Sequence, residues 1–381
     1  VLMLVLLACF VLVAWPQAAA KNIIKTFDPP GPPGAYNPYQ GTQALAINSD
    51  GAIAGFYSDS IFVYHGFLRA PDGTFTLFDA PDAGTQSVAG FVPTPLGVLG
   101  GQGTYATAMN DAGTITGFYV DIMNVMHGFL RTSDGAIAEF MIPGAGRSAG
   151  QGTAPLGINK NGAIAGIYVD SNGLNHVFLE DPTGGLIKFD APGAGTGAGQ
   201  GTFMSYASCL TPNGGITGFY VDANNVAHGF VRGYDGSVAT FDAPNAGLAA
   251  GQGTYAWSIN SSMQVTGMVI DSYGVMHGYV RYADGSFRKF DARGAGRHLG
   301  QGTVGNGINL HGIVVGNFIN SWGENRGFWR AYGGAIKRFS VTKSGKGLGQ
   351  GTVPMANNQY GVTSGSFFDD NFGIHGFFIT F

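Results

Sequence analysis

Aspartate and histidine recur along the chain at a fixed separation, and this pair is the feature of the sequence that most suggests chemistry. In six places an Asp stands six residues before a His: Asp59 and His65, Asp121 and His127, Asp170 and His176, Asp222 and His228, Asp271 and His277, Asp369 and His375. A carboxylate beside an imidazole can orient a general base or support a histidine that ligates a metal.

The recurrence of the pairs favours a structural role over a catalytic one. On a β-hairpin the two positions face each other across neighbouring strands, close enough for a side-chain hydrogen bond. A pair that is present in nearly every copy of a repeat is expected to stabilise the repeat unit itself. The sixth copy has Asn320 and Arg326 instead, which would keep a polar contact but could not hold a metal. We therefore expect structural pairs, with no catalytic residue, no metal and no cofactor.

A repeat of about 49 residues carries these pairs. The tripeptide Gln-Gly-Thr occurs seven times, and the His follows it by 25 or 28 residues; the tripeptide begins at Gln40, Gln102, Gln151, Gln200, Gln252, Gln301 and Gln350. At the crossing from one repeat to the next, its Gly permits close backbone approach, and its Gln and Thr can satisfy backbone groups of the loop. A ring of seven such polar groups that binds a ligand on the axis is the alternative.

Each repeat reads as four short strands joined by tight turns. In the fifth copy the strands are expected at 254–260, 264–271, 275–282 and 286–292. Sheets of this kind stack radially as propeller blades, which have repeats of this length. The sequence therefore predicts an all-β, seven-bladed β-propeller of four-stranded antiparallel blades, with an open β-solenoid as the alternative.

The two ends of the chain favour the closed form. The last repeat stops within its third strand at Phe381, whereas residues 22–28, NIIKTFD, match the fourth strand of other repeats. Pairing these two segments removes exposed sheet edges. We expect the N-terminal strand to complete the last blade.

Composition limits the classes of partner. Charged residues make up 11% of the chain and the net charge is −4, with the 19 Lys and Arg taken as scattered rather than clustered. Such a chain has no basic footprint, so nucleic acid is not an expected partner. An extracellular glycan or a protein partner fits better, and the oligomeric state is left open.

Residues 1–20 form an apolar run followed by Ala18, Ala19 and Ala20, the pattern of a signal peptide with its cleavage site. An N-terminal anchor is the alternative. We expect an exported chain, secreted or periplasmic, that makes no membrane contact once the signal is removed, with residues 21–381 as a single propeller domain. That domain has Cys209 as its only cysteine, so it holds no internal disulfide.

The repeat pattern resembles a known family. The string GQGT, then IN, G.I.G.Y.D, HGF, DG and FD.PGAG, is similar to the extracellular HAF-repeat proteins, named for a His-Ala-Phe tripeptide that here has Gly in the middle. The likeness extends over residues 21–381. It implies export and a repeat fold, and it brings no established activity or catalytic residue.

Residues that the fold requires recur in every copy, so ligand contacts are expected at positions where the copies differ. The strand predicted to face the central channel carries aromatic residues in some copies only: Tyr105, Phe203, Tyr255 and Trp257, with Tyr206 as an alternative to Phe203. Such a mouth could stack on sugar rings or apolar ligands. Packing between blades is the other interpretation.

Three further departures from the repeat were weighed. Insertions lie within 87–101 and 203–214, and the second contains Cys209, which is expected to be a buried thiol rather than a nucleophile. The sixth copy adds Trp322, Glu324 and Trp329 as a secondary candidate cluster.

The sequence thus favours a secreted binding or structural module over an enzyme. The alternative is a secreted hydrolase or lyase that acts on polysaccharide at the channel mouth. Glycoside hydrolysis requires two carboxylates close together, whereas nearly every Asp here occupies a repeat position.

Overall fold

The computed structural model of the chain describes residues 23–30, 38, 40–86, 92–94, 97–99, 101–205 and 208–381. Within these ranges every regular element is a β-strand, and 28 of the strands belong to one sheet. The all-β expectation is therefore confirmed. No helix of the described residues is long and apolar enough to cross a membrane. The predicted export segment, residues 1–20, lies outside the described ranges.

Strand pairing divides the sheet into antiparallel units of four strands, lettered here along the chain. Unit A comprises β2 (Thr42–Ile47), β3 (Ile53–Ser58), β4 (Tyr64–Arg69) and β5 (Phe75–Phe78). Unit B comprises β8 (Gly103–Met109), β9 (Ile115–Val120), β10 (Met126–Arg131) and β11 (Ile137–Phe140). Unit C comprises β12 (Gly152–Ile158), β13 (Ile164–Val169), β14 (Asn175–Glu180) and β15 (Leu186–Phe189). Unit D comprises β16 (Gly201–Phe203), β17 (Ile216–Val221), β18 (Ala227–Arg232) and β19 (Val238–Phe241).

Two more units follow the same plan. Unit E comprises β20 (Gly253–Ile259), β21 (Val265–Ile270), β22 (Met276–Arg281) and β23 (Phe287–Phe290), which agrees with the predicted strands to within two residues. Unit F comprises β24 (Gly302–Ile308), β25 (Val314–Ile319), β26 (Asn325–Arg330) and β27 (Ile336–Phe339). A small separate hairpin, β6 (Val92–Thr94) with β7 (Gly97–Leu99), falls in the first insertion.

The last unit, G, draws its fourth strand from the other end of the chain. It comprises β28 (Gly351–Asn357), β29 (Val362–Phe368), β30 (Ile374–Thr380) and β1 (Ile23–Phe27). Strand β1 pairs antiparallel with β30, from Ile23 opposite Thr380 to Phe27 opposite Gly376. The predicted pairing of the N-terminal strand with the last strand is therefore present.

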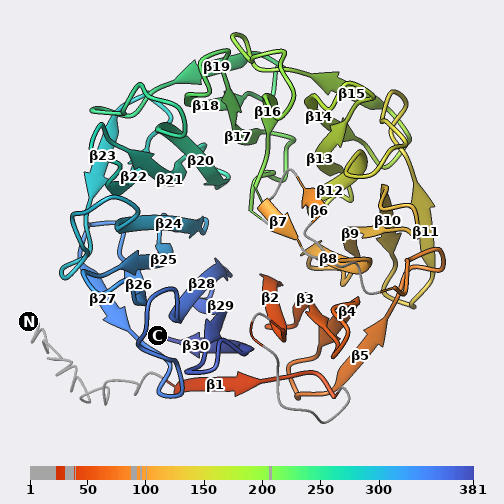
Figure 1. Cartoon of the computed structure of the whole chain (residues 1–381), viewed down its shortest axis with the longest axis horizontal. Coiled ribbons are helices and arrows are strands. Elements are labelled where there is room, and N and C mark those ends of the chain that lie inside the picture. Colours follow the sequence, from red (N-terminus) through yellow and green to blue (C-terminus); the bar gives the residue numbers. More distant parts are fainter. Residues whose placement is uncertain are drawn as a thin grey trace, which may run out of the picture.

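The units are arranged around a ring, with the first strand of each innermost and the fourth strand at the rim (Figure 1). This arrangement is a propeller-type fold. In every unit the aromatic residue two positions after the His, or after Arg326 in unit F, is fully buried and forms the centre of the blade core: Phe67, Phe129, Phe178, Phe230, Tyr279, Phe328 and Phe377.

Glycine is required where one unit crosses to the next. Gly152 lies in the left-handed region at φ 122° and forms a parallel bridge to Met126 of the preceding unit. A Cβ on Gly152 would lie 2.0 Å from the carbonyl oxygen of Met126. No side chain fits there, which explains the invariant second residue of Gln-Gly-Thr.

The flanking Gln and Thr of the tripeptide hold the crossing loop by hydrogen bonds. In unit C, Gln151 donates from Nε2 to the carbonyl of Ser171 at 3.1 Å and accepts the amide of Ser148 at 3.0 Å. The hydroxyl of Thr153 accepts the amide of Ile142 at 2.9 Å. The structural interpretation of Gln-Gly-Thr is confirmed, because its polar groups are engaged with the loop.

Candidate functional site

The recurring His lies between two carboxylates, not beside one. In unit E, His277 Nε2 is 3.3 Å from Asp271, six residues before it, and Nδ1 is 2.9 Å from Asp291, fourteen residues after it. The same arrangement is found in units A, C, D and G, with the second carboxylate supplied by Asp79, Asp190, Asp242 and Asp28. In unit B only Asp121 contacts His127, at 2.9 Å, because Met141 replaces the second Asp.

These triads join three strands of a blade. The imidazole belongs to the third strand, the first Asp to the turn before it, and the second Asp to the end of the fourth strand. The first Asp also closes its own turn: Asp271 Oδ1 accepts the amides of Tyr273 and Val275, both at 2.9 Å. In units A to D and G an aromatic ring stacks on the imidazole, such as Tyr119 on His127 at 4.9 Å. The geometry suits a fastener whose partners are all within the blade.

Electrostatics at the triads follow from this geometry. Burial by itself would lower the pKa of His65, but the hydrogen bond and charge of Asp79, with Asp59, outweigh it and raise that pKa. The pKa of His375 is raised in the same way by Asp28 and Asp369, against the opposing effect of burial. The described residues contain no group of three or more His, Cys, Asp or Glu arranged to hold a metal ion.

Unit F departs from the predicted polar contact. Asn320 and Arg326 do not replace the pair directly, because each contacts Glu324 instead. The Asn320 amide donates to Glu324 Oε2 at 2.8 Å, and Arg326 lies 3.1 Å from the same oxygen. Glu324 is 5% exposed, so it acts as a buried counter-ion between the two.

The predicted aromatic mouth is wrong for its first two members. Tyr105 is fully buried; it stacks on Phe118 at 4.8 Å and on Tyr64 of the preceding unit at 4.7 Å. Phe203 is also buried and stacks on Phe219 at 5.1 Å. Tyr105 lies between neighbouring blades, and both rings are buried rather than exposed at a channel mouth.

The other two members are half-buried. The Tyr255 hydroxyl donates to the carbonyl of Gly251 at 3.0 Å, and the Tyr255 ring contacts Phe219 at 5.0 Å, so this side chain also bridges units. Trp257 keeps part of its surface exposed on the innermost strand β20. Tyr206, the alternative to Phe203, lies outside the described residues.

The secondary cluster is not brought together. Trp322 is 76% exposed at the turn between β25 and β26, and Glu324 is buried beside it. Trp329 lies further along β26, where its ring is 5.8 Å from the ring of Phe381 and 5.8 Å from Lys337 Nζ. The three residues therefore form no common site. Cys209 is fully buried, and burial raises its pKa to about 12, so it is no nucleophile.

A cavity at one end of the central channel draws residues from all the units. Its volume is about 390 Å³, and it lies where each innermost strand ends. Six units supply an asparagine, with Thr211 in unit D: Asn48, Asn110, Asn159, Asn260, Asn309 and Asn358. Four of the six follow an Ile and so belong to the Ile-Asn string of the repeat, but the arrangement in a ring is visible only in the structure.

The asparagines connect neighbouring units. Asn358 donates from Nδ2 to the carbonyl of Asn48 at 3.0 Å, which links unit G to unit A. Its Oδ1 accepts the amides of Tyr360 and Val362, both at 3.0 Å. Equivalent donor bonds run from Asn110, Asn159, Asn260 and Asn309 to the following unit. These side-chain amides already form hydrogen bonds within the protein, so their role is to hold neighbouring units together.

The residue after each asparagine, by contrast, differs among the units and also lines the cavity. These positions are Ser49, Asp111, Lys160, Pro212, Ser261, Leu310 and Gln359. Lys160 and Asp111 are exposed, and Ser49 is half-buried. Positions that vary among the units, next to the recurring asparagines, are typical of a recognition surface, because the fold does not dictate the residues at the varying positions.

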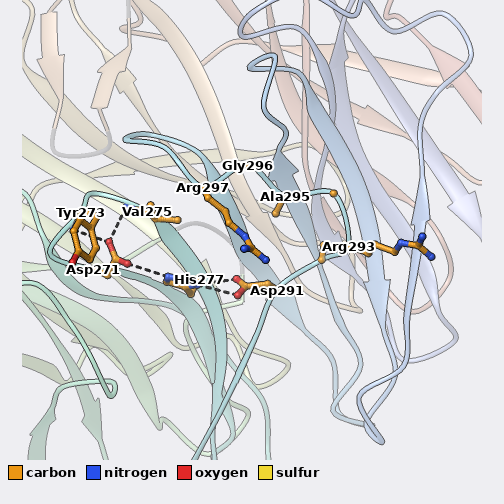
Figure 2. A pocket seen from close by; sticks show the side chains of 11 residues that line it. Asp271, Tyr273, Val275, His277, Asp291, Arg293, Ala295, Gly296 and Arg297 are labelled. Carbon is orange, nitrogen blue, oxygen red and sulfur yellow. Dashed lines mark hydrogen bonds and ion pairs between the residues drawn. The ribbon is translucent and has the colours of Figure 1, made fainter.

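A second cavity, of about 540 Å³, lies beside the triad of unit E. Figure 2 shows His277 between Asp271 and Asp291, with Tyr273 at one end and Arg297 extending alongside. Arg293 stands on the far side of Asp291 from His277. In units A to D, Pro occupies the position of Arg293.

Comparison with known proteins identifies neither a family nor an activity. No family model matches the chain, and no curated protein matches it. Among solved structures, the BP39L lectin from Burkholderia pseudomallei is 12% identical, with 89% of this chain and 99% of that chain covered at a TM-score of 0.47. AofleA from Arthrobotrys oligospora is 12% identical, with coverage of 84% and 90% and a TM-score of 0.45. TolB from Acinetobacter baumannii is 10% identical, with coverage of 86% and 80% and a TM-score of 0.41. At this level of similarity no ligand or activity is transferred to this chain.

Proposed function

We propose that the chain is an extracytoplasmic binding module, built as a closed seven-bladed β-propeller, that holds a carbohydrate at one end of its central channel. The antiparallel pairing of β1 with β30 and the parallel bridge between Gly41 and Ile374 support closure, since the second joins unit G to unit A. The apolar segment 1–20 supports export, and the repeat pattern supports membership of the HAF-repeat proteins.

The channel-end cavity carries the proposal. Its volume of about 390 Å³ is within the range of small-molecule sites, roughly 300–1,000 Å³. Seven side chains of six residue types lie next to a ring of hydrogen-bonded asparagines. Function on a repeat scaffold is expected where the copies differ.

A carbohydrate suits the chemistry of this layer. Lys160 offers donors, Asp111 offers an acceptor, and Ser261 offers a hydroxyl that does both. Gln359 and Ser49 add polar groups that are joined to each other, because Gln359 Nε2 donates to the Ser49 hydroxyl at 3.2 Å. Sugar hydroxyls need such mixed partners within a short distance. The asparagine ring hydrogen-bonds to the backbone of the turns that carry these side chains. Holding that backbone in place reduces the entropy lost on binding.

A glycan array with the purified protein tests the proposal. We expect binding of a defined sugar, weakened at least about tenfold in the variant Lys160→Ser with Gln359→Ser, which copies the serines of units A and E. Lys188→Thr, a loss of one exposed cation on the outer strand β15, is the control and should bind normally. If the parent, the double variant and the control bound the sugar with equal affinity, the cavity would not be the binding site.

The same sugars also test the enzyme alternative. Among the described lining residues Asp111 supplies the one carboxylate, and its Oδ1 accepts the amide of Ser49 at 2.8 Å. Hydrolysis of a glycoside uses two carboxylates about 5–9.5 Å apart. Binding without turnover is therefore expected. Release of reducing ends or of unsaturated sugar would contradict the binding module.

A further inference from the structure

Positive charge is concentrated in one sector of the molecule. Residues 288–346 contain ten of the 19 Lys and Arg but only two of the 23 Asp and Glu, so their net charge is +8. The rest of the chain has nine basic and 21 acidic residues, a net charge of −12. The expectation that the basic residues are scattered is therefore wrong for this sector.

Equivalent positions in the other units show that the fold does not require these cations. The two central residues of each outer strand are exposed or half-buried at the rim. They are Arg288 and Lys289 in β23, and Lys337 and Arg338 in β27. The corresponding residues of β19 in unit D are Ala239 and Thr240, which build the same strand without charge.

The loops after these two strands extend the charge. Arg293 and Arg297 follow β23, and Lys343 and Lys346 follow β27; all four are exposed. With the four residues of the outer strands they define what we call the basic sector. Figure 1 shows β23 and β27 as neighbours on the rim of the ring.

Contacts between units make the sector continuous. Arg338 Nη1 of unit F donates to the carbonyl of Arg293 in unit E at 2.9 Å. The guanidinium of Arg288 reaches the turn of unit F, where a Cβ on Gly334 would lie 3.2 Å from its Nη2. The cations therefore form one surface across two blades.

Among the described residues, no carboxylate lies within ion-pair distance of these cations. Asp291 is engaged by His277 at 2.9 Å, and Glu324 by Arg326 at 3.1 Å. Within the described residues none of the eight side chains of the basic sector forms an ion pair. Eight uncompensated cations on neighbouring elements create a positive potential that attracts anions.

Two exposed aromatic side chains flank the same loops. Tyr273 is 82% exposed in unit E and Trp322 is 76% exposed in unit F, at the equivalent position of the turn before the third strand. Units C, D and G have Asn172, Asn224 and Asn371 there. Tyr273 and Arg297 both line the cavity beside the triad of unit E (Figure 2). Exposed rings beside cations suit a ligand with both apolar sugar faces and negative charge.

We propose that the basic sector, with Tyr273 and Trp322, binds an acidic polysaccharide chain. An extended polyanion matches cations spread over two blades, and its pyranose faces match the two exposed rings. This site is separate from the channel-end cavity, so the two ligands are independent. The cations run along the exposed edge of the ring as well as over its loops, which fits a flexible chain better than a flat bilayer.

The test measures affinity of the purified protein for polygalacturonate and dextran sulfate against neutral dextran. Binding of both polyanions, and not of dextran, is expected at about 0.1 M salt, with loss at about 1 M salt as the Debye length falls from ~10 to ~3 Å. The variant Arg288→Ala, Lys289→Thr, Lys337→Ala takes the residues of unit D and should bind at least about tenfold more weakly. Trp322→Asn, which copies units C, D and G, should weaken binding several-fold.

A charge-matched control separates a defined surface from net charge. Lys25→Ala, Arg147→Thr, Lys188→Thr removes three exposed cations elsewhere and should leave affinity unchanged. Equal losses in both triple variants, or no binding of either polyanion, would overturn the proposal. So would tighter binding of phosphatidylglycerol vesicles or duplex DNA than of the polysaccharides, since the partner would then be of another class. Binding to the neutral sugars of the glycan array does not depend on this surface, so each proposal can fail alone.

Discussion

Single asparagines join the blades at one end of the channel, and Asn358 allows the strength of this joint to be measured. Its Oδ1 caps its own turn and its Nδ2 bonds to Asn48 of unit A. Asn358→Ala is expected to lower the free energy of unfolding by about 1–3 kcal/mol, because buried backbone groups lose their partners. Asn358→Thr, which copies Thr211 of unit D, keeps an acceptor for the turn and should cost less. Urea denaturation measures both; a Thr variant as stable as the parent would show that the link between units contributes nothing.

His65 and His375 are expected to make the stability depend on pH. The pKa of His65 in the folded chain is raised above the usual value of 6.5, as is that of His375, so their contribution is complete below about pH 6.5 and is lost as pH rises through the raised pKa values. The pKa of Asp271 is lowered, because hydrogen bonds from Val275 and Tyr273 outweigh burial; its contribution is lost as pH falls through that pKa. Stability should therefore be highest between these two ranges.

The variant Asp79→Met isolates the effect of His65, since it copies Met141 of unit B. The pKa of His65, followed by NMR titration, should fall in this variant, and the decline in stability above pH 6.5 should become shallower. An unchanged titration would show that Asp79 does not raise the pKa.

At the level of side chains the sequence predicted half of each triad. The spacing of six links Asp59 to His65 within one turn and is visible without a structure. The contact with Asp79 depends on strand register, because Gly66 pairs with Phe78 and so brings the preceding His opposite the following Asp. The second Asp of each triad is visible in the sequence as the Asp of the recurring Phe-Asp string. The sequence alone does not show which residue of the neighbouring strand lies opposite it.

Strand β1 is the element on which the closing unit depends. Phe27 lies 6.2 Å from Phe67 and 6.0 Å from Phe75 of unit A, and the guanidinium of Arg69 lies 5.2 Å from its ring centre. Phe27→Ala is expected to cost about 2–3 kcal/mol, less than the ~3–5 kcal/mol of a fully buried Phe. Thermal unfolding measures the loss. Lys25→Thr on the same strand is the control and should be near neutral.

Removal of the whole strand tests closure itself. A deletion of residues 21–28 exposes the edge of β30 and takes away Asp28, whose carboxylate bonds to His375 at 2.8 Å and to the Thr42 hydroxyl at 2.7 Å. Loss of folding or aggregation is expected, because an open edge invites pairing with other chains. A soluble protein of unchanged stability would contradict the role of β1.

The positions of the strands could be predicted where the repeat period fixes them. The direction in which individual side chains point could not. Strands of unit E were located to within two residues from turn signals alone. The direction of Tyr105 was misjudged because each innermost strand outside unit D carries a bulge, in unit B between Ala106 and Ala108. A bulge changes which residues share a face, so simple alternation does not identify the channel lining.

For the whole molecule, the proposed closure of the ring predicts that the chain can be opened at more than one place. In unit G the chain is interrupted between the third and fourth strands, where Ile23 lies opposite Thr380. The same place in unit E is the turn Ala283-Asp284-Gly285 between β22 and β23. A circular permutant that starts at Gly285 and joins Phe381 to Ile23 by a short Asp-Gly turn should fold as a monomer. Its melting temperature should stay within a few degrees of that of the parent, because every strand keeps its neighbours. In this permutant β23 is the N-terminal strand that completes the last unit, as β1 does in the parent. Circular dichroism and light scattering measure both properties. A permutant that opens within β21 instead breaks a strand and should not fold; if the two behaved alike, the units would not be equivalent members of a closed ring.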